Sequence, residues 1–312
     1  ATSRTIVDLP LGPKRGATPS PSRLTPSRLT PSALTADTAA LMLYTSGTTG
    51  RPKGAVHTHA TVRSMVTCLV EAWQWTEHDR ILHCLPLHHV HGLVNKLLCP
   101  LWVGARCDML PRFDALTVFE RLADQEFTLF MAVPTIYAKL IEAWERADGD
   151  TQARWSAGTT RLRLMVSGSA ALAIPTLQRW RVITDHVLLE RYGMTEVGIV
   201  LTNPLHGERR PGFVGGPVPG MQVRLVDDSG KTQTEADAVG ELQVRGDNVF
   251  VGYWRRPDET AASFTDDGWF RTGDHVALQG GAYRIAGRLS TDIIKSGGYK
   301  ISALEIESVL LA

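Results

Sequence analysis

The chain has 312 residues, of which 43% are hydrophobic and 21% charged, a composition typical of a globular protein with one large or two smaller domains. Its 33 Lys and Arg residues balance 32 Asp and Glu residues, so no excess of positive charge indicates a nucleic-acid or membrane-surface partner. No apolar run is long enough to span a bilayer, and we expect small-molecule substrates and no integral membrane segment.

The cysteines lack CxxC spacing and lie in stretches that read as buried: Cys68, Cys84, Cys99 and Cys107. This pattern favours reduced thiols in an intracellular compartment and argues against a zinc site.

Residues 1–36 are rich in Ser, Thr and Pro and contain the near-repeat PSRLTPSRLTPSALT at 21–35. Such a segment cannot bury a core and predicts a disordered linker. Its Arg, Ser and Thr residues also loosely suit an organelle transit segment. Because the chain starts with Ala, we expect a fragment or a processed product.

From residue 37 the pattern changes. AALMLY (39–44) is a short apolar strand that runs into a glycine-rich loop, and 59–73 has apolar residues at helical spacing, so strand, loop and helix are expected in that order. Further apolar runs at 81–87, 127–134, 162–170 and 186–193 alternate with helical patterns at 115–125 and 134–147. This alternation predicts a largely parallel α/β sheet, whose ligands bind beyond the carboxyl ends of its strands.

After about Gly212 the pattern changes to shorter segments in which apolar and polar residues alternate, at 221–228, 240–246, 269–279 and 283–288. These segments predict a small barrel or sandwich. The last residues, 302–312, have helical spacing. We therefore divide the chain into a linker (1–36), a partial large domain (37–287) and a hinge with the start of a C-terminal domain (288–312).

The stretch YTSGTTGRPKG at 44–54 combines glycines, hydroxyl side chains and Lys53. Glycines let a backbone approach a ligand closely, while hydroxyls, free N–H groups and a lysine donate to phosphate oxygens. The loop is not of the GxxxxGK[ST] type, because Pro52 and Gly54 break that pattern. A polyphosphate is the predicted ligand, and the competing interpretation is a plain surface turn.

This loop resembles the signature phosphate loop of the adenylate-forming superfamily, which includes acyl-CoA synthetases, luciferases and adenylation domains. Further motifs match in the family's order: LPLHHVHG (85–92), SGSA (167–170), ERYGMTE (190–196), FRTGD (270–274) and GRLSTDIIKSGGYK (287–300). The resemblance covers about residues 40–312. It implies an α/β large-domain core with a mostly parallel sheet, a small β-barrel-like part and only the start of the C-terminal domain.

Within the family, ERYGMTE and LPLHHVHG look most like malonyl-CoA synthetases, especially the mitochondrial member that uses malonate and methylmalonate. The resemblance implies an acid:CoA ligase that uses ATP, Mg²⁺ and coenzyme A and forms an acyl-AMP intermediate. It favours the mitochondrial matrix, with the cytoplasm as the alternative, and leaves the oligomeric state open.

The resemblance assigns roles to individual residues. Catalytic roles fall to Lys53, Thr195, Glu196 and Lys295, with Glu196 also on Mg²⁺. ATP contacts fall to Thr45, Ser46, Gly47, Thr48, Thr49, Gly50, Lys53, Gly168, Ser169, Ala170, Tyr192, Gly193, Thr195, Asp274 and Arg288. A competing interpretation makes Thr195 and Glu196 the first turn of a helix.

The acid pocket is expected at Arg191, where a guanidinium can bind a second carboxylate bidentately. His89 matches the family histidine near the acyl group, and His91 adds polarity there. This pattern favours a dicarboxylate such as malonate. Two alternatives stay open: Arg191 pairs with Glu190 or a core acid, and the histidines are ordinary core polar groups.

The hinge is expected within 290–292, with Lys295 acting in the thioester step. The family's adenylation lysine lies beyond residue 312 by resemblance, so we expect this chain to bind ATP poorly and to catalyse little. The alternative functions are a medium-chain or aromatic acyl-CoA synthetase, an inactive nucleotide-binding fragment, and an adenylation domain that serves a carrier protein.

Overall fold

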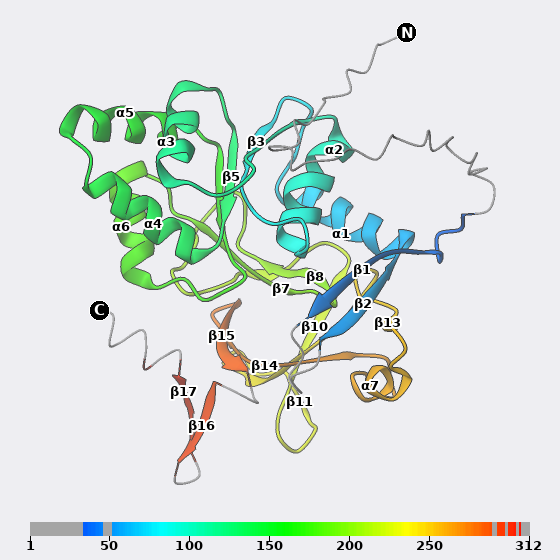
Figure 1. The fold of residues 1–312 in the computed structure, drawn as a ribbon. Coiled ribbons are helices and arrows are strands. Elements are labelled where there is room, and N and C mark those ends of the chain that lie inside the picture. Colours follow the sequence, from blue (N-terminus) through cyan, green and yellow to red (C-terminus); the bar gives the residue numbers. More distant parts are fainter. Residues whose placement is uncertain (1–33, 46–51, 289–291, 297–298, 304–305, 307–312) are drawn as a thin grey trace. The chain divides into compact units, whose positions relative to one another are not determined.

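Short apolar runs form the central sheet of the protein (Figure 1). The computed structural model describes residues 34–45, 52–288, 292–296, 299–303 and 306, without the side chains of 293–301. The central sheet has the order β4-β3-β5-β6-β7-β8-β9, parallel from β4 to β7 and antiparallel from β7 to β9. Its strands are β3 (Arg80–His83), β4 (Arg106–Met109), β5 (Leu129–Ala132), β6 (Leu164–Ser167), β7 (Leu189–Met194), β8 (Gly198–Thr202) and β9 (Gly216–Pro217).

Both faces of the parallel strands are buried, because successive side chains of a strand point to opposite faces and both faces are covered. Ile81 belongs to one hydrophobic core and its neighbour Leu82 to the other. The same alternation separates Leu129 from Phe130 and Leu164 from Met165. The predicted parallel α/β sheet is therefore confirmed.

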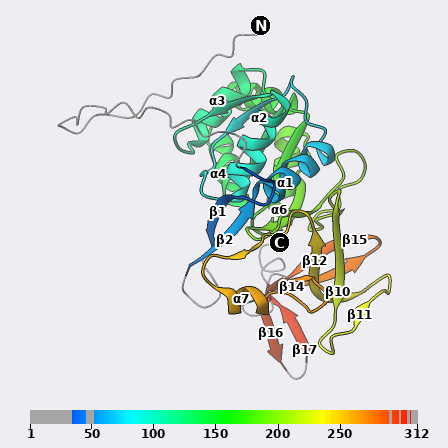
Figure 2. The same ribbon diagram turned by 90° about the vertical axis from the view of Figure 1, so that its right-hand side faces the viewer.

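Helices cover the two faces (Figures 1 and 2). One face carries α1 (His59–Ala72), the π-helix η2 (His91–Leu98) and α2 (Cys99–Val103), and the other carries α3 (Ala115–Asp124), α4 (Pro134–Glu145), α5 (Gly149–Thr160) and α6 (Ile174–Thr184). Side-chain caps at Thr58, Asp114 and Asp148 start α1, α3 and α5. Among the described residues no helix combines the length and apolarity needed to cross a bilayer.

The phosphate-loop region differs from the expected strand, loop and helix. A second strand, β2 (Lys53–Thr58), precedes α1 and pairs antiparallel with β1 (Ala39–Thr45) on one side and β13 (Gly252–Tyr253) on the other. Lys53 therefore starts a strand and lies opposite Thr45. The sequence KGAVHT of β2 is too short and too mixed to predict on its own.

The segments after Gly212 form the predicted strands, which make an antiparallel sheet of order β11-β10-β12-β14-β15. Within the described residues, β11 and β15 do not pair with each other, so these strands form an open sheet and not a closed barrel. The strands are β10 (Met221–Val226), β11 (Thr232–Gln233), β12 (Val239–Gly246), β14 (Phe270–Gln279) and β15 (Ala282–Arg288); a helix, α7 (Pro257–Ala262), precedes β14, and a hairpin of β16 (Ile293–Ser296) and β17 (Tyr299–Ser302) follows. The linker prediction for 1–36 and the helix expected over 302–312 fall mostly outside the described residues.

An ion pair with a buried carboxylate, that of Asp79, ties the end of α1 to the central sheet. Arg163 donates to both carboxylate oxygens of Asp79, at 2.7 Å each, and to the carbonyl of Trp73 at 3.0 Å. The Asp79 carboxylate also accepts from the Thr128 hydroxyl and the Thr76 amide. Burial alone would raise the pKa of Asp79, but these hydrogen bonds outweigh it and lower the pKa.

Asp79→Asn should lower the free energy of unfolding by about 2 kcal/mol at neutral pH, because the variant leaves Arg163 without its charged partner. Since the folded pKa of Asp79 is lowered, the difference from wild type should be present above the unfolded pKa and should vanish as the pH falls through the folded one. Urea unfolding at several pH values measures it. The exposed Asp266→Asn is the control, and equal stabilities of wild type and Asp79→Asn at pH 7 would contradict this account.

Candidate active site

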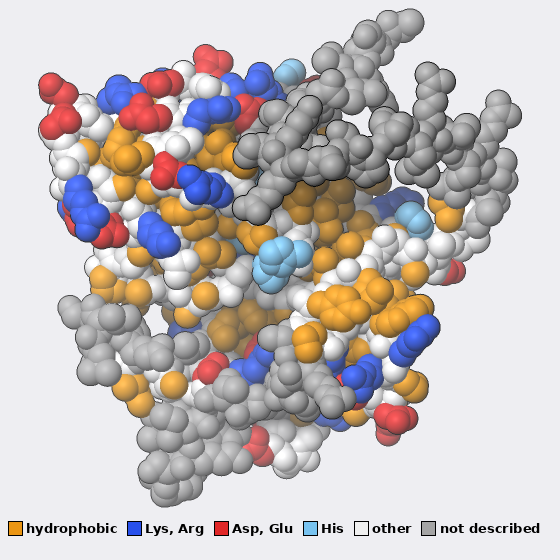
Figure 3. All heavy atoms as spheres, viewed as in Figure 1, with side chains coloured by type: hydrophobic (Ala, Val, Ile, Leu, Met, Phe, Trp, Pro, Cys, Tyr) orange, Lys and Arg blue, Asp and Glu red, His pale blue; other side chains and the backbone are white. Residues whose placement is uncertain are grey.

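A cavity of about 1430 Å³ opens where the β1–β2 hairpin, the β7–β8 turn, the β13–α7 segment and β14 meet. Seen as spheres, the molecule carries histidine side chains near the centre of the face in view, among hydrophobic ones (Figure 3). The cavity is lined by ten of the predicted site residues: Thr45, Lys53, His89, His91, Ser169, Arg191, Gly193, Thr195, Glu196 and Arg288.

The other predicted site residues do not line this cavity within the described part of the chain. Four lie beside lining residues in the sequence: Gly168, Ala170, Tyr192 and Asp274. The loop residues Ser46, Gly47, Thr48, Thr49 and Gly50 lie outside the described residues, as do the side chain of Lys295 and the first two residues, 290 and 291, of the predicted hinge.

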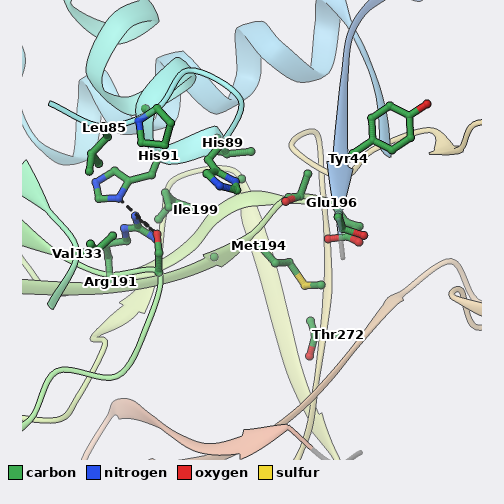
Figure 4. Close-up of a pocket in the computed structure, with 18 of the residues that line it drawn as sticks. Tyr44, Leu85, His89, His91, Val133, Arg191, Met194, Glu196, Ile199 and Thr272 are labelled. Atoms are coloured by element: carbon green, nitrogen blue, oxygen red, sulfur yellow. Dashed lines mark hydrogen bonds between the residues drawn. The ribbon is translucent and has the colours of Figure 1, made fainter. Parts of the chain in front are cut away.

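Arg191 lies at one end of the cavity beside His91, while Glu196 lies toward the β1–β2 hairpin (Figure 4). The Arg191 side chain is buried, and its Nη2 donates to the Ser169 hydroxyl at 3.1 Å. Its Nε has no hydrogen-bond partner among the described residues. The guanidinium also passes so close to Gly168 that a Cβ there would meet Nε at 2.6 Å. Glycine at this turn is therefore required by the position of Arg191.

No carboxylate among the described residues lies within ion-pair distance of Arg191. Burial lowers the pKa of Arg191 to about 10. The neighbouring strand residue Glu190 faces the opposite side of β7 and accepts the Gly212 amide at 2.8 Å. The alternative in which Arg191 pairs with Glu190 or a core acid is therefore wrong for the described residues.

More basic groups are buried behind Arg191. The ring of His91 is buried, its Nε2 has no partner, and its Nδ1 lies 3.4 Å from the Ser169 hydroxyl. Burial, followed by the charges of Arg191 and Lys96, holds the pKa of His91 well below its usual value. The Lys96 ammonium is fully buried and donates to the Met131 carbonyl at 2.5 Å. This end of the cavity is neutral or positive and is suited to an anion.

The other end of the cavity is built on the β7–β8 turn. Thr195 and Glu196 lie in this tight turn, so their interpretation as the start of a helix is wrong. His57 of β2 lies 2.8 Å from the Thr195 carbonyl through its Nε2, and the Phe250 amide donates to the Glu196 carbonyl at 2.8 Å. At Gly193 a Cβ would meet the Gly198 carbonyl oxygen at 2.1 Å, so the hairpin requires glycine there.

The Glu196 carboxylate is buried, and burial raises its pKa despite a hydrogen bond from the Tyr253 hydroxyl at 2.8 Å. No cation in the described part of the chain lies within ion-pair distance of it. Lys53, at the start of β2, pairs instead with Glu259 of α7, with Nζ 2.7 Å from Oε2.

Asp274 lies at the border of the cavity with both carboxylate oxygens bonded. Tyr192 donates its hydroxyl to Oδ2 at 2.5 Å, and Arg288 donates Nε to Oδ1 at 2.9 Å. The hydrogen bond to Asp274 is the largest cause of the raised pKa of Arg288. Strand alternation turns Tyr192 toward Asp274 and away from the side of Arg191.

Three charged or polar residues of this region were missed by the sequence reasoning: Lys96, Tyr253 and Glu259. The available signal for Lys96 was its place in an apolar helical run. A lysine at such a place is unusual, because lysine side chains are rarely buried. Tyr253 and Glu259 lie in GYWRRPDET, where nothing in the sequence indicates contact with residues 57 and 206 positions away.

The buried Glu190 carboxyl makes the stability of this region depend on pH. Burial raises its pKa to about 7. Because the folded pKa is raised, its contribution should be fully present below the unfolded pKa and be lost as the pH rises through about 7. Relative to Glu190→Gln, wild type should lose on the order of 3 kcal/mol between pH 5 and pH 8.

Denaturant unfolding at each pH measures this difference, with the exposed Glu126→Gln as the control. Parallel pH profiles for wild type and Glu190→Gln would show that Glu190 does not titrate in this range.

Known proteins resemble this chain in sequence and in fold. The model of the family described as AMP-binding enzyme matches residues 3–254. The mitochondrial malonate–CoA ligase ACSF3 of Bos taurus is 51% identical over 301 residues, covering 88% of this chain and 51% of that protein. ATP-bound MatB from Rhodopseudomonas palustris is 39% identical, with a TM-score of 0.79, covering 88% of this chain and 52% of that one.

A malonyl-CoA ligase in a ternary product complex with methylmalonyl-CoA and AMP gives a TM-score of 0.75 at 44% identity, over 88% of this chain and 58% of that one. The chain thus spans about half the length of the relatives that it matches. The likeness confirms the predicted α/β fold of adenylate-forming enzymes. Because the family model matches most of its residues, the chain belongs to the AMP-binding enzyme family.

Proposed function

We propose that this chain is part of an ATP-dependent acid:CoA ligase that activates malonate. The observation that carries the proposal is the buried Arg191 guanidinium, which has no carboxylate partner in the part of the chain that the structure describes and lines the same cavity as Lys53 and Glu196. The matched relative from Bos taurus is named a malonate–CoA ligase, and one similar structure holds methylmalonyl-CoA and AMP. Both names support a small dicarboxylate as the acid.

In this proposal Arg191 binds the distal carboxylate of malonate. A carboxylate accepts two parallel hydrogen bonds from a guanidinium, and that of Arg191 lines the cavity without a carboxylate partner among the described residues. His91 lines the cavity beside it and adds polarity at this end. A monocarboxylic acid of similar size places a methyl group there and leaves the guanidinium unpaired, which is costly in a buried site.

The reacting carboxylate then attacks the α-phosphorus of ATP, the bond to the bridging oxygen breaks, and acyl-AMP and pyrophosphate form. Lys53, Thr45 and Thr195 line the cavity where the triphosphate charge must be stabilised. The loop residues Ser46–Gly50, which lie outside the described residues, stay proposed ATP ligands from their sequence motif. Lys53 must exchange Glu259 for phosphate oxygens. His89 lies between the two ends of the cavity (Figure 4), where the acyl group would bind.

The donor set at Glu196 fits Mg²⁺. This ion prefers one or two carboxylates together with phosphate oxygens, and Glu196 is a buried carboxylate without a paired cation beside the Thr195 hydroxyl. When bound, Mg²⁺ would neutralise phosphate charge at this turn. Burial raises the pKa of Glu196, and a cation bound beside the carboxylate would lower it.

Asp274 and Arg288 would contact the ribose, and Gly168, Ser169, Ala170, Gly193 and Tyr192 the adenine side. Each Asp274 oxygen already accepts one bond and has a second lone pair to offer a ribose hydroxyl. In the second half-reaction the thiol of coenzyme A attacks the acyl carbon and AMP leaves, with Lys295 as the proposed residue of that step.

Two rivals make different predictions. A medium-chain or aromatic acyl-CoA synthetase has no use for a buried guanidinium in the cavity wall, so the position of Arg191 disfavours it. An inactive fragment would release no pyrophosphate even when the chain is extended by the segments that the longer relatives carry. Assaying the 312-residue chain beside such an extended version separates fragment from enzyme, and we expect little activity from the shorter one.

We propose the mitochondrial matrix as the location, because the matched Bos taurus relative is named mitochondrial. Imaging of the tagged, extended protein tests this, and a uniform cytoplasmic signal would favour the alternative.

Arg191→Met in the extended protein should lower kcat/KM for malonate by at least about 100-fold, because a buried carboxylate loses its charged partner. The kcat/KM for butyrate should fall much less, and KM for ATP should stay within about threefold. Pyrophosphate release with both acids measures the ratio. Arg112→Met removes another arginine of the cavity wall, which is exposed, and should leave the malonate-to-butyrate ratio unchanged.

A wild-type enzyme that prefers butyrate or octanoate to malonate would contradict the assignment of Arg191. An equal loss with malonate and butyrate in Arg191→Met would show that the residue supports the fold and not the choice of acid.

A further inference from the structure

One segment, β13 with the start of α7, contacts both charged groups at the phosphate end of the cavity. Tyr253 donates its hydroxyl to Glu196 Oε1 at 2.8 Å. The Lys53 ammonium lies over the ring of the same tyrosine, 5.0 Å from its centroid. Glu259, six residues further on, accepts from Lys53 at 2.7 Å. Tyr253 itself lines the cavity.

Backbone hydrogen bonds fix this segment to both elements that carry the charges. Tyr253 pairs with Ala55 of β2, and the Trp254 amide donates to the Gly54 carbonyl at 2.7 Å, next to Lys53. On the other side the Phe250 amide bonds to the Glu196 carbonyl. The tyrosine is therefore held between the strand of Lys53 and the turn of Glu196.

Lys53 and Glu196 line the same cavity and influence each other electrostatically, yet the ion pair of Lys53 is with Glu259. The Tyr253 ring provides a face for the ammonium, and its hydroxyl provides a neutral donor for the carboxylate. Both charges thus remain within reach of the cavity without cancelling each other.

We propose that Tyr253 is the positioning residue of the phosphate end: it orients Glu196 toward a divalent cation and keeps Lys53 apart from Glu196. Glu259 holds Lys53 until phosphate oxygens replace it. This inference rests on the proposed function for the identity of the ligand, ATP with Mg²⁺. A hydroxyl that bonds one oxygen of a metal-binding carboxylate fixes its orientation, and loss of such a partner commonly costs 10- to 100-fold in metal affinity.

The test uses Tyr253→Phe in the extended protein, which keeps the ring beneath Lys53 and removes only the hydroxyl. ATP binding is followed by calorimetry across a range of Mg²⁺ concentrations, and Mn²⁺ binding in the presence of ATP is followed by electron paramagnetic resonance. The concentration of either cation at half-saturation should rise about tenfold. The Kd for ATP at saturating Mg²⁺ should change less than twofold.

Two further variants make the result specific. Glu259→Gln releases Lys53 from its ion pair and should tighten ATP binding about threefold at low salt, with the cation dependence unchanged. Tyr283→Phe removes the hydroxyl of another partly buried tyrosine, on β15, and should change neither quantity.

An unchanged cation half-saturation in Tyr253→Phe, with ATP binding intact, would overturn the role of Tyr253. Weaker ATP binding in Glu259→Gln would overturn the role of Glu259. Failure of the proposed function looks different, because wild-type protein would then bind ATP and Mg²⁺ but release no pyrophosphate with malonate.

Discussion

The site depends on a positive charge that the protein itself does not neutralise. Arg191 is buried in the wall of a large cavity, bonds only a serine hydroxyl among the described residues and keeps one guanidinium N–H without a partner. Such a charge costs several kcal/mol of folding free energy unless a ligand pairs with it. His91 and Lys96 add buried basic groups on the same side. An anionic ligand at this end would offset this cost, so a dicarboxylic acid explains the structure better than a fatty acid.

Strand geometry enforces the arrangement. The strand β7 carries Arg191, and the turn that follows it carries Glu196, five residues further on. Alternation along β7 turns Glu190 and Tyr192 to partners away from Arg191, the Gly212 amide and the Asp274 carboxylate. One strand thus separates a site for a carboxylate from a site for a cation and phosphate. The buried carboxylates of Glu190 and Asp274 have partners of their own and do not pair with Arg191.

The sequence predicted strands β3, β5, β6 and β7 and helices α1, α3 and α4, because their apolar periodicity is strong, but it missed β4, β8, η2, α2, α5 and α6. Its motifs named ten residues that line one cavity. It failed where tertiary pairing decides. Nothing local indicates that β2 intervenes before α1, that Thr195 and Glu196 lie in a hairpin turn, or that Lys53 pairs with Glu259. Which charges stay unpaired is also a property of the fold. The sequence left open whether Arg191 pairs with Glu190, and strand alternation decided it.

The most direct measurement observes the Arg191 Nε–H group itself. In extended protein labelled with ¹⁵N-arginine, with the resonance assigned by its loss in a substituted protein, malonate added beside a non-hydrolysable ATP analogue should move this resonance, because a carboxylate then pairs with the Arg191 guanidinium. Butyrate at the same concentration should leave it in place. A resonance that ignores malonate while the enzyme turns malonate over would contradict the central claim that this guanidinium binds the second carboxylate.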